Sequence, residues 1–319
     1  MRKINLPTLP PLAVLIAGLV VTSPCTFAID ALSPVERFLG SAYDAAEYSD
    51  LDIDQEKRFA PASPADSDLG DQLILKRYDN SAPVRFDLST QLFWTDNTAS
   101  TNSQEEDGII WQSRLRASWQ PRIGNNLFLN LAASQDVYRY DSPGSLDFER
   151  TDLRAGLIKT APDFFDILFF ARYEYTRVTS GSLSDGIYGA HRIRAGAHKM
   201  FLSTAKHSAY VALDAAHNLN ATPGLLERNE YSAHLGYTYQ ITDKLRAALY
   251  YHFAYYDYGT GGREDYNHVI GTELYWQVSR STRLHASLTY VQNDSNLPAG
   301  AADYDSIQGG LGIGFTTRF

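Results

Sequence analysis

From about residue 84 to the end of the chain, apolar and polar side chains alternate with a period of two. In "YSAHLGYTYQ" (residues 231–240), the apolar and aromatic members stand at odd positions and the polar members and glycine at even ones. Successive side chains of a strand point to opposite sides, so this alternation predicts strands with one apolar face. Twelve such stretches begin near Val84, Ile109, Leu127, Thr151, Ile167, Ile187, Ala209, Tyr231, Leu245, Tyr266, Leu284 and Ile307. We therefore expect twelve strands, and ten or fourteen if the seventh or first stretch is misread.

The connections between these stretches alternate between short and long. Short turns are "PRIGNN", "APDFFD", "ITDK" and "SRST", whereas "TDNTASTNSQEEDG", "NLNATPGLLERNE" and "YDYGTGGRED" are longer and polar. An even number of strands with short turns at one end and long loops at the other is typical of an antiparallel barrel in the bacterial outer membrane. The pattern predicts both ends of the barrel on the short-turn side, which faces the periplasm.

A soluble β-sandwich is the main rival, since its strands alternate as well. Stretches of this length match the roughly 9–11 tilted residues that cross a bilayer, whereas soluble strands average about five or six. Aromatic residues also gather near strand ends, as expected for two interfacial girdles. We assign Trp94, Tyr138, Tyr140, Tyr173, Tyr175, Tyr239, Tyr255 and Tyr290 to the loop side, and Trp119, Phe128, Phe169, Trp276 and Phe319 to the turn side. These features favour a transmembrane, all-β, up-and-down barrel.

The chain ends on "GGLGIGFTTRF", a strand with apolar residues on one face and glycines or polar residues on the other. Leu311, Ile313, Phe315 and Phe319 are expected to face lipid, and the glycines to relieve crowding inside. The stretch resembles the C-terminal recognition signal of bacterial outer-membrane proteins, which ends in an aromatic residue. That resemblance implies that the barrel-assembly machinery reads Ile313, Phe315 and Phe319.

The first 28 residues have the features of a secretory signal peptide. A basic tip (Arg2, Lys3) precedes an apolar core and a small-residue exit, so cleavage is expected after Ala28. The only cysteine, Cys25, leaves with this peptide, and no disulfide framework is expected. A lipoprotein signal would need a leucine about three residues before Cys25, where Thr22 stands. No apolar run reaches the roughly 20 residues of a membrane-spanning helix.

Residues 29–83 differ in composition from the rest of the chain. "ALSPVERFLGSAYDAAEY" predicts an amphipathic helix, with Ser33 as N-cap, Pro34 in the first turn and Val35, Phe38 and Leu39 on one face. "APASPADSD" follows as a linker. We interpret residues 29–83 as a periplasmic helix and linker. A plug or a helix that docks a partner is the alternative.

The polar face of the barrel carries charges of both signs, and these are the candidate pore-lining residues. They are Arg114, Arg116, Arg154, Arg172, Arg192, Arg194 and Arg246, with Asp87, Asp136, Asp152, Glu174, Glu230 and Glu273. Fixed guanidinium groups along a pore favour anionic solutes. Alternatively, these charges pair across the lumen and fill it. Twelve strands lie between the packed interior of eight and the open channel of sixteen.

Other chemistry finds little support. His285 and Ser287 in "HAS" share a strand face, but that face is inward and no partner carboxylate is identifiable, so lipid hydrolysis is not favoured. The other histidines lack metal-ligand spacing, and no glycine-rich phosphate loop is present. We predict no catalytic residue, metal or cofactor. The formal charge of −9, or −11 without Arg2 and Lys3, and the lack of basic clusters argue against nucleic acid.

Most of the chain, from "DLGDQLILKRYDN" onward, resembles the putative outer-membrane β-barrel porins of Gram-negative bacteria. The motifs are "LFWTDN", "YQITDKLRAALYYHFAYYDY" and the final "GGLGIGFTTRF". The resemblance implies outer-membrane location and a channel role, sometimes linked to polysaccharide export, and it supplies no functional residues. We predict that residues 84–319 form a barrel for passive diffusion of small solutes, with a preference for anions or acidic saccharides. We do not expect the protein to be an enzyme. A polysaccharide-export or plugged structural barrel is the alternative. Expected partners are outer-membrane lipid, lipopolysaccharide and small solutes.

Overall fold

A computed structural model describes residues 83–319, apart from residues 99, 101–105, 142–146, 181–184, 260 and 299–301. The predicted signal peptide and the predicted helix after it lie outside the described residues. Within the described part of the chain, no helix is long and apolar enough to cross a membrane.

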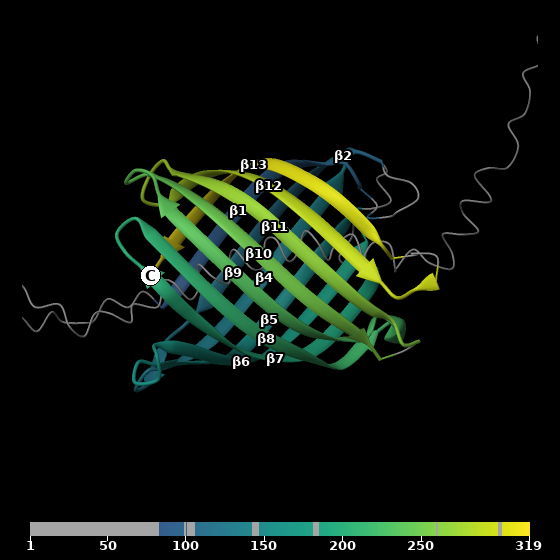
Figure 1. The fold of residues 1–319 in the computed structure, drawn as a ribbon, viewed down its shortest axis with the longest axis horizontal. Helices are drawn as coiled ribbons and strands as arrows, with labels where there is room; N and C mark the ends of the chain where they lie inside the picture. The colour runs from purple at the N-terminus through teal and green to yellow at the C-terminus, as the bar shows by residue number, and fades with distance from the viewer. Residues whose placement is uncertain are drawn as a thin grey trace, which may run out of the picture.

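Twelve long strands and one short strand form a single antiparallel sheet that closes on itself (Figure 1). The long strands are β1 (Val84–Thr95), β2 (Gly108–Trp119), β4 (Leu127–Tyr140), β5 (Phe148–Ala161), β6 (Ile167–Ser180), β7 (Gly186–Ser203), β8 (His207–Thr222), β9 (Arg228–Gln240), β10 (Leu245–Tyr258), β11 (Glu264–Gln277), β12 (Thr282–Ser295) and β13 (Tyr304–Arg318). The predicted count of twelve is confirmed. The extra strand β3 (Arg122–Gly124) extends the pairing of β4 into the predicted turn, with a register shift.

Closure rests on β1, which pairs with β2 on one side and with β13 on the other. Leu88 stands opposite Leu115 in β2 and Phe315 in β13. The backbones of Val84 and Phe319 exchange hydrogen bonds of 3.2 and 2.9 Å. A closed ring leaves no unpaired sheet edge, which is the requirement for strands in a bilayer.

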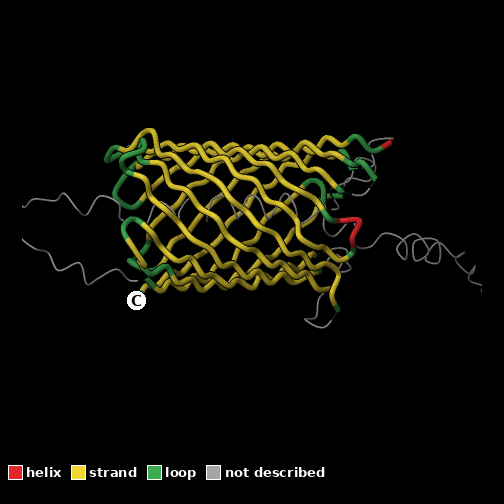
Figure 2. Tube along the Cα trace, turned by 90° about the horizontal axis from the view of Figure 1, so that it is seen from below, coloured by secondary structure: helices red, strands yellow, loops and turns green. Residues whose placement is uncertain are grey.

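The connections separate into two ends of the barrel (Figure 2). Residues 120–126, 162–166, 204–206, 241–244 and 278–281 link strands at the end where Val84 and Phe319 lie, which we call the turn end. The opposite end, the loop end, carries the remaining connections. One of these, between β8 and β9, contains the short 3-10 helix η3 (Gly224–Leu226) and is shorter than predicted because both strands extend further.

The two faces of the wall are inverted relative to a soluble protein. Large apolar side chains lie exposed on the outer face, with Leu311 at 70% exposure and Leu249 at 51%. Polar side chains are buried on the inner face, where Asp136 and Asn267 have no exposed surface. A β-sandwich would bury its apolar face, so this arrangement excludes the rival fold and fits a barrel surrounded by lipid.

The predicted aromatic girdles are right in part. Tyr138, Tyr140 and Phe128 share a face with the buried Asp136, so they point inward and not toward lipid. Tyr239 does face outward, but it lies at the turn end because β9 runs from the loop end to the turn end. The inward residues were misplaced because we did not consider which face of the wall each one occupies. Tyr239 was misplaced because we did not consider the direction in which β9 runs.

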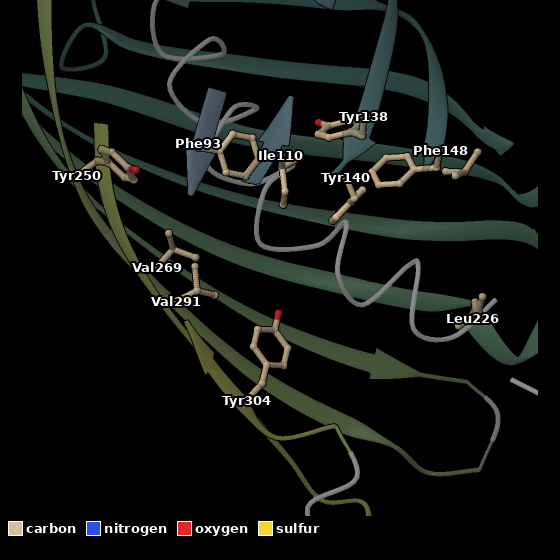
Figure 3. Packing of buried hydrophobic residues seen from close by; sticks show 11 residues of the cluster. Phe93, Ile110, Tyr138, Tyr140, Phe148, Leu226, Tyr250, Val269, Val291 and Tyr304 are labelled. Atoms are coloured by element: carbon tan, nitrogen blue, oxygen red, sulfur yellow. The ribbon is translucent and has the colours of Figure 1, made fainter. Parts of the chain in front are cut away.

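The inner face also carries an apolar layer that the alternation did not reveal (Figure 3). Its buried members form one cluster. They come from strands on both sides of the barrel, chiefly toward the loop end, and Leu226 comes from η3. They are Phe93, Ile110, Tyr138, Tyr140, Phe148, Val178, Leu226, Tyr250, Val269, Val291 and Tyr304. We call this set the inner apolar layer. A second, smaller inward cluster near the turn end joins Ile158, Leu168 and Phe170.

Candidate functional site: the charged inner wall

The structure places every predicted pore-lining residue on the inner face of the barrel. Because alternate residues of each strand face inward, the structure also places on the inner face several charged residues that were not predicted there. The inward arginines of the strands are Arg85, Arg114, Arg116, Arg150, Arg154, Arg172, Arg192, Arg194, Arg228, Arg246, Arg283 and Arg318, and the inward carboxylates are Asp87, Asp136, Asp152, Glu174, Asp214, Glu230, Asp265 and Glu273. Arginine therefore exceeds carboxylate on the inner wall.

The densest part of the wall is a network on β6, β7, β8 and β9. Glu174 accepts a hydrogen bond from Arg172 Nε at 2.7 Å, and its carboxylate also lies 3.5 Å from Arg192 Nη2 and 3.3 Å from Arg194 Nε. Glu230 in turn lies 3.7 Å from Arg192 and 3.1 Å from Arg194. Three arginines thus share two glutamates, and the central network retains a surplus of positive charge before Asp214 is counted.

Strand register explains why these residues meet. Glu174 stands directly across from Arg154 in β5 and from Arg192 in β7. Arg172 and Arg194 are also direct partners, a like-charge pair that opposes pairing unless a carboxylate bridges it. Glu174 provides that bridge, because it contacts both guanidinium groups.

Asp214 and His234 belong to the network, and the sequence analysis missed both. Asp214 forms an ion pair with Arg194 and lies 3.0 Å from His234 Nε2. The His234 ring packs against that of His252 in β10, with centroids 4.3 Å apart. The inward position of Asp214 was detectable from alternation. Leu213 and Leu219 stand at odd positions of the same strand and face outward, so the even position 214 faces inward.

Smaller polar clusters extend the charged wall from this network toward β2. Asp136 pairs with Arg114, and Gln112 Nε2 donates to Asp136 and to Tyr138 Oη at 3.3 and 2.9 Å. In β5, Asp152 accepts from Arg150 at 2.8 Å and from the hydroxyl of Thr176 at 2.7 Å. Nearly all mid-height charge on the inner wall therefore lies between β2 and β9.

The facing wall, from β10 through β13 to β1, is built differently. Glycines at its inner positions leave room for neighbouring side chains: a Cβ on Gly271 would lie 2.0 Å from Tyr250 Oη. Tyr250 extends across that position to Thr289 in β12, 3.0 Å from its hydroxyl. The inward carboxylates of this wall are Asp87 and Glu273, with Asp265 at the loop end. The described inner wall thus has a charged side and a side rich in glycine and hydroxyl groups.

The "HAS" pair lies on this second wall. His285 Nε2 donates to Gln91 Oε1 at 3.0 Å, crossing β13 at Gly312. Ser287 stands opposite Glu273, so a carboxylate does lie beside the pair, contrary to our expectation. His285 is nevertheless hydrogen-bonded to an amide oxygen across the seam, which gives it a structural role in closing the barrel. Among the described residues, no group of three His, Cys, Asp or Glu is arranged to hold a metal ion.

The closed sheet, the exposed apolar outer face and the buried polar inner face together define a transmembrane β-barrel of the outer-membrane class. Residues 215–317 match a family model described as Putative beta-barrel porin 2, which supports the resemblance seen in the sequence. No curated protein matches the chain.

Solved structures extend the likeness over the whole barrel. An outer membrane channel from Pseudomonas putida covers 73% of this chain and 95% of its own at 12% identity, with a TM-score of 0.51. The NanC porin covers 72% and 98% at 11% identity, with a TM-score of 0.43. The KdgM porin, solved in complex with disordered oligogalacturonate, covers 72% and 98% at 11% identity, with a TM-score of 0.40. The match to the Pseudomonas putida channel supports a shared fold. The TM-scores of the other two are too low to support any conclusion about this chain.

Proposed function

We propose that this protein is an outer-membrane channel for passive diffusion of small solutes, with a preference for anions or acidic saccharides. The observation that carries the proposal is the excess of arginine on the inner wall, where the inward arginines of the strands outnumber the inward carboxylates. Arginine keeps its charge at any physiological pH and presents several donors in a plane, which suits carboxylate and phosphate groups. In this proposal the turn end faces the periplasm, with Val84 and Phe319.

The experiment is single-channel conductance of the refolded mature protein in planar bilayers, with reversal potentials in a salt gradient. We expect anion preference, and a shift toward no preference when Arg192→Gln and Arg194→Gln are combined. Arg177→Gln is the matched control, because Arg177 lies on the outer face of β6 and is exposed. Heat-modifiable migration establishes that each variant is folded. Folded protein without conductance would overturn the proposal.

A closed, structural barrel is the second candidate. The ion pairs on the inner wall and the inner apolar layer favour it, because both remove polar surface from a water-filled passage. The same conductance measurement separates the two candidates.

A further inference from the structure

The barrel carries lysine at one of its two ends only. Residues 84–319 contain four lysines, and all of them lie at or near the turn end: Lys159, Lys199, Lys206 and Lys244. Lys159 in β5 and Lys199 in β7 belong to the outward set of their strands, since they lie an even number of residues from the exposed Leu157 and Ile193. A lipid-facing lysine keeps its stem in hydrocarbon and its ammonium at the interface. These two lysines therefore mark the level of the lipid headgroups.

Both ammonium groups are held at that level by the backbone of a turn. Lys159 Nζ donates a hydrogen bond to the carbonyl oxygen of Asn125 at 2.7 Å, and Lys199 Nζ donates to that of Phe165. Asn125 precedes β4 and Phe165 precedes β6, so each lysine reaches to the turn of a neighbouring hairpin. An ammonium has three donors, and within the described part of the chain each of these two uses one. Both can therefore donate to a further acceptor.

The turn between β5 and β6 carries two carboxylates beside these lysines. Asp163 and Asp166 are exposed, and among the described residues neither forms an ion pair with Lys159 or Lys199. Asp166 directly follows Phe165, whose carbonyl binds Lys199. Charges of both signs thus lie next to each other here without neutralising each other.

Exposed phenylalanines lie in the same turn. Phe164 and Phe165 are 55% and 71% exposed, and Phe164 stacks on Phe169 of β6, whose ring faces lipid. Phe165 has a φ of 57° and Asp166 a φ of 53°, in the left-handed region that bulky residues rarely adopt. The turn therefore presents the Phe165 ring outward at a conformational cost, which points to a function for this exposed residue.

We propose that these residues form a binding site for one phospholipid with an ethanolamine headgroup. The site, which we call the turn-end patch, consists of Lys159, Lys199, Asp163, Asp166, Phe164, Phe165 and Phe169. The lysines stand on either side of β6, on strands roughly 10 Å apart, so both side chains can reach one phosphate between them. The ethanolamine ammonium would donate to the aspartates, and the acyl chains would lie along the phenylalanine rings.

The two signs of charge are what select this headgroup. Ethanolamine carries an ammonium with N–H donors, which form charge-assisted hydrogen bonds with carboxylates. Choline has the same charge but no N–H donor, and a glycerol headgroup leaves only the negative phosphate beside Asp163 and Asp166. This inference goes beyond the proposed function, because it concerns the outer surface and holds whether or not the lumen conducts.

Native mass spectrometry of the refolded mature protein tests the site. Equal amounts of phosphatidylethanolamine, phosphatidylcholine and phosphatidylglycerol are added to the detergent, and the bound lipids are counted. We expect the ethanolamine adduct to exceed the choline adduct several-fold. Asp163→Asn with Asp166→Asn should make these two adducts equal, and the turn keeps its shape because asparagine also adopts the left-handed conformation. Lys159→Gln with Lys199→Gln should reduce all three adducts, since each lipid carries the phosphate.

The turn between β9 and β10 supplies the matched control. Asp243 and Lys244 place the same two kinds of charge at the same end of the barrel, and both are exposed. Asp243→Asn with Lys244→Gln should leave the lipid preference unchanged, and an equal loss in this variant would overturn the proposal.

Two results on the unmodified protein would also overturn it. One is equal binding of the ethanolamine and choline lipids, and the other is a glycerol adduct that exceeds both, which would mean that the patch recognises negative charge alone. Heat-modifiable migration establishes that each variant is folded. A barrel that does not conduct but keeps its preference for ethanolamine refutes the proposed channel and not the turn-end patch.

Discussion

At the scale of single residues, the seam of the barrel depends on a glycine. Gly312 in β13 lies between His285 in β12 and Gln91 in β1, and the two side chains meet above it. Gln91 extends this series of hydrogen bonds, because its amide nitrogen donates to the amide oxygen of Gln112 in β2. The absence of a side chain at Gly312 therefore permits a series of polar contacts that runs from β12 across β13 to β1 and β2.

We expect Gly312→Ala to lower the free energy of unfolding by about 1–3 kcal/mol, the usual cost of overpacking. Its Cβ would lie 2.4 Å from the His285 ring and 2.8 Å from Gln91 Cβ. Gly309→Ala is the control, since the nearest atoms to its Cβ are 3.7 and 3.8 Å away. Urea denaturation followed by tryptophan fluorescence measures both. Equal losses would show that the space above Gly312 is not what matters.

At the scale of elements, the strands were predictable because alternation and strand length are both local properties. Each predicted start lies within three residues of an observed one; Ile307, for example, corresponds to Tyr304. The same alternation predicted the inner face for the arginines that we expect to line a pore, and the structure has them on that face. It did not indicate that Asp214 would meet Arg194, because that contact depends on the register between β7 and β8. Nor did it reveal the inner apolar layer, since Tyr138 and Phe148 break the rule that the inner face is polar.

The lipid exposure of each hairpin gives a prediction at this scale. Leu249 lies at mid-height on the outer face of β10, and Ile241 lies in the turn that precedes this strand. An arginine at the bilayer midplane costs about 2–4 kcal/mol, and near the interface about 0–1. Leu249→Arg is expected to destabilise the folded barrel in vesicles by the larger amount and Ile241→Arg by the smaller. The same cost for both, in urea titrations, would place Leu249 outside the hydrocarbon.

At the scale of the whole molecule, the barrel is completed by its last residues. The Phe319 ring packs edge-on against Phe86, with centroids 6.2 Å apart, while its backbone pairs with Val84. The terminal aromatic therefore joins the first and last strands as well as facing lipid. Closure could be foreseen from an even strand number, whereas the pairing that achieves it required the structure.

We expect Phe319→Ala to reduce the amount of heat-modifiable barrel in the outer membrane several-fold, because it removes both the seam contact and the proposed assembly signal. Leu311→Ala is the matched control, an exposed apolar residue on the same face of β13. Membrane fractions analysed with and without heating measure the folded yield. An unchanged yield for Phe319→Ala would remove the terminal aromatic from the assembly signal.

The contact between Val84 and Phe319 also means that the barrel is a ring whose two ends nearly touch. A short covalent join there, with a new break between Asp141 and Asp147, would give a circular permutant with the same strand neighbours. Its leading segment would then emerge at the opposite rim. The rim at which a preceding segment is attached is thus decided by where the ring is cut, whereas the pairing of the strands stays the same.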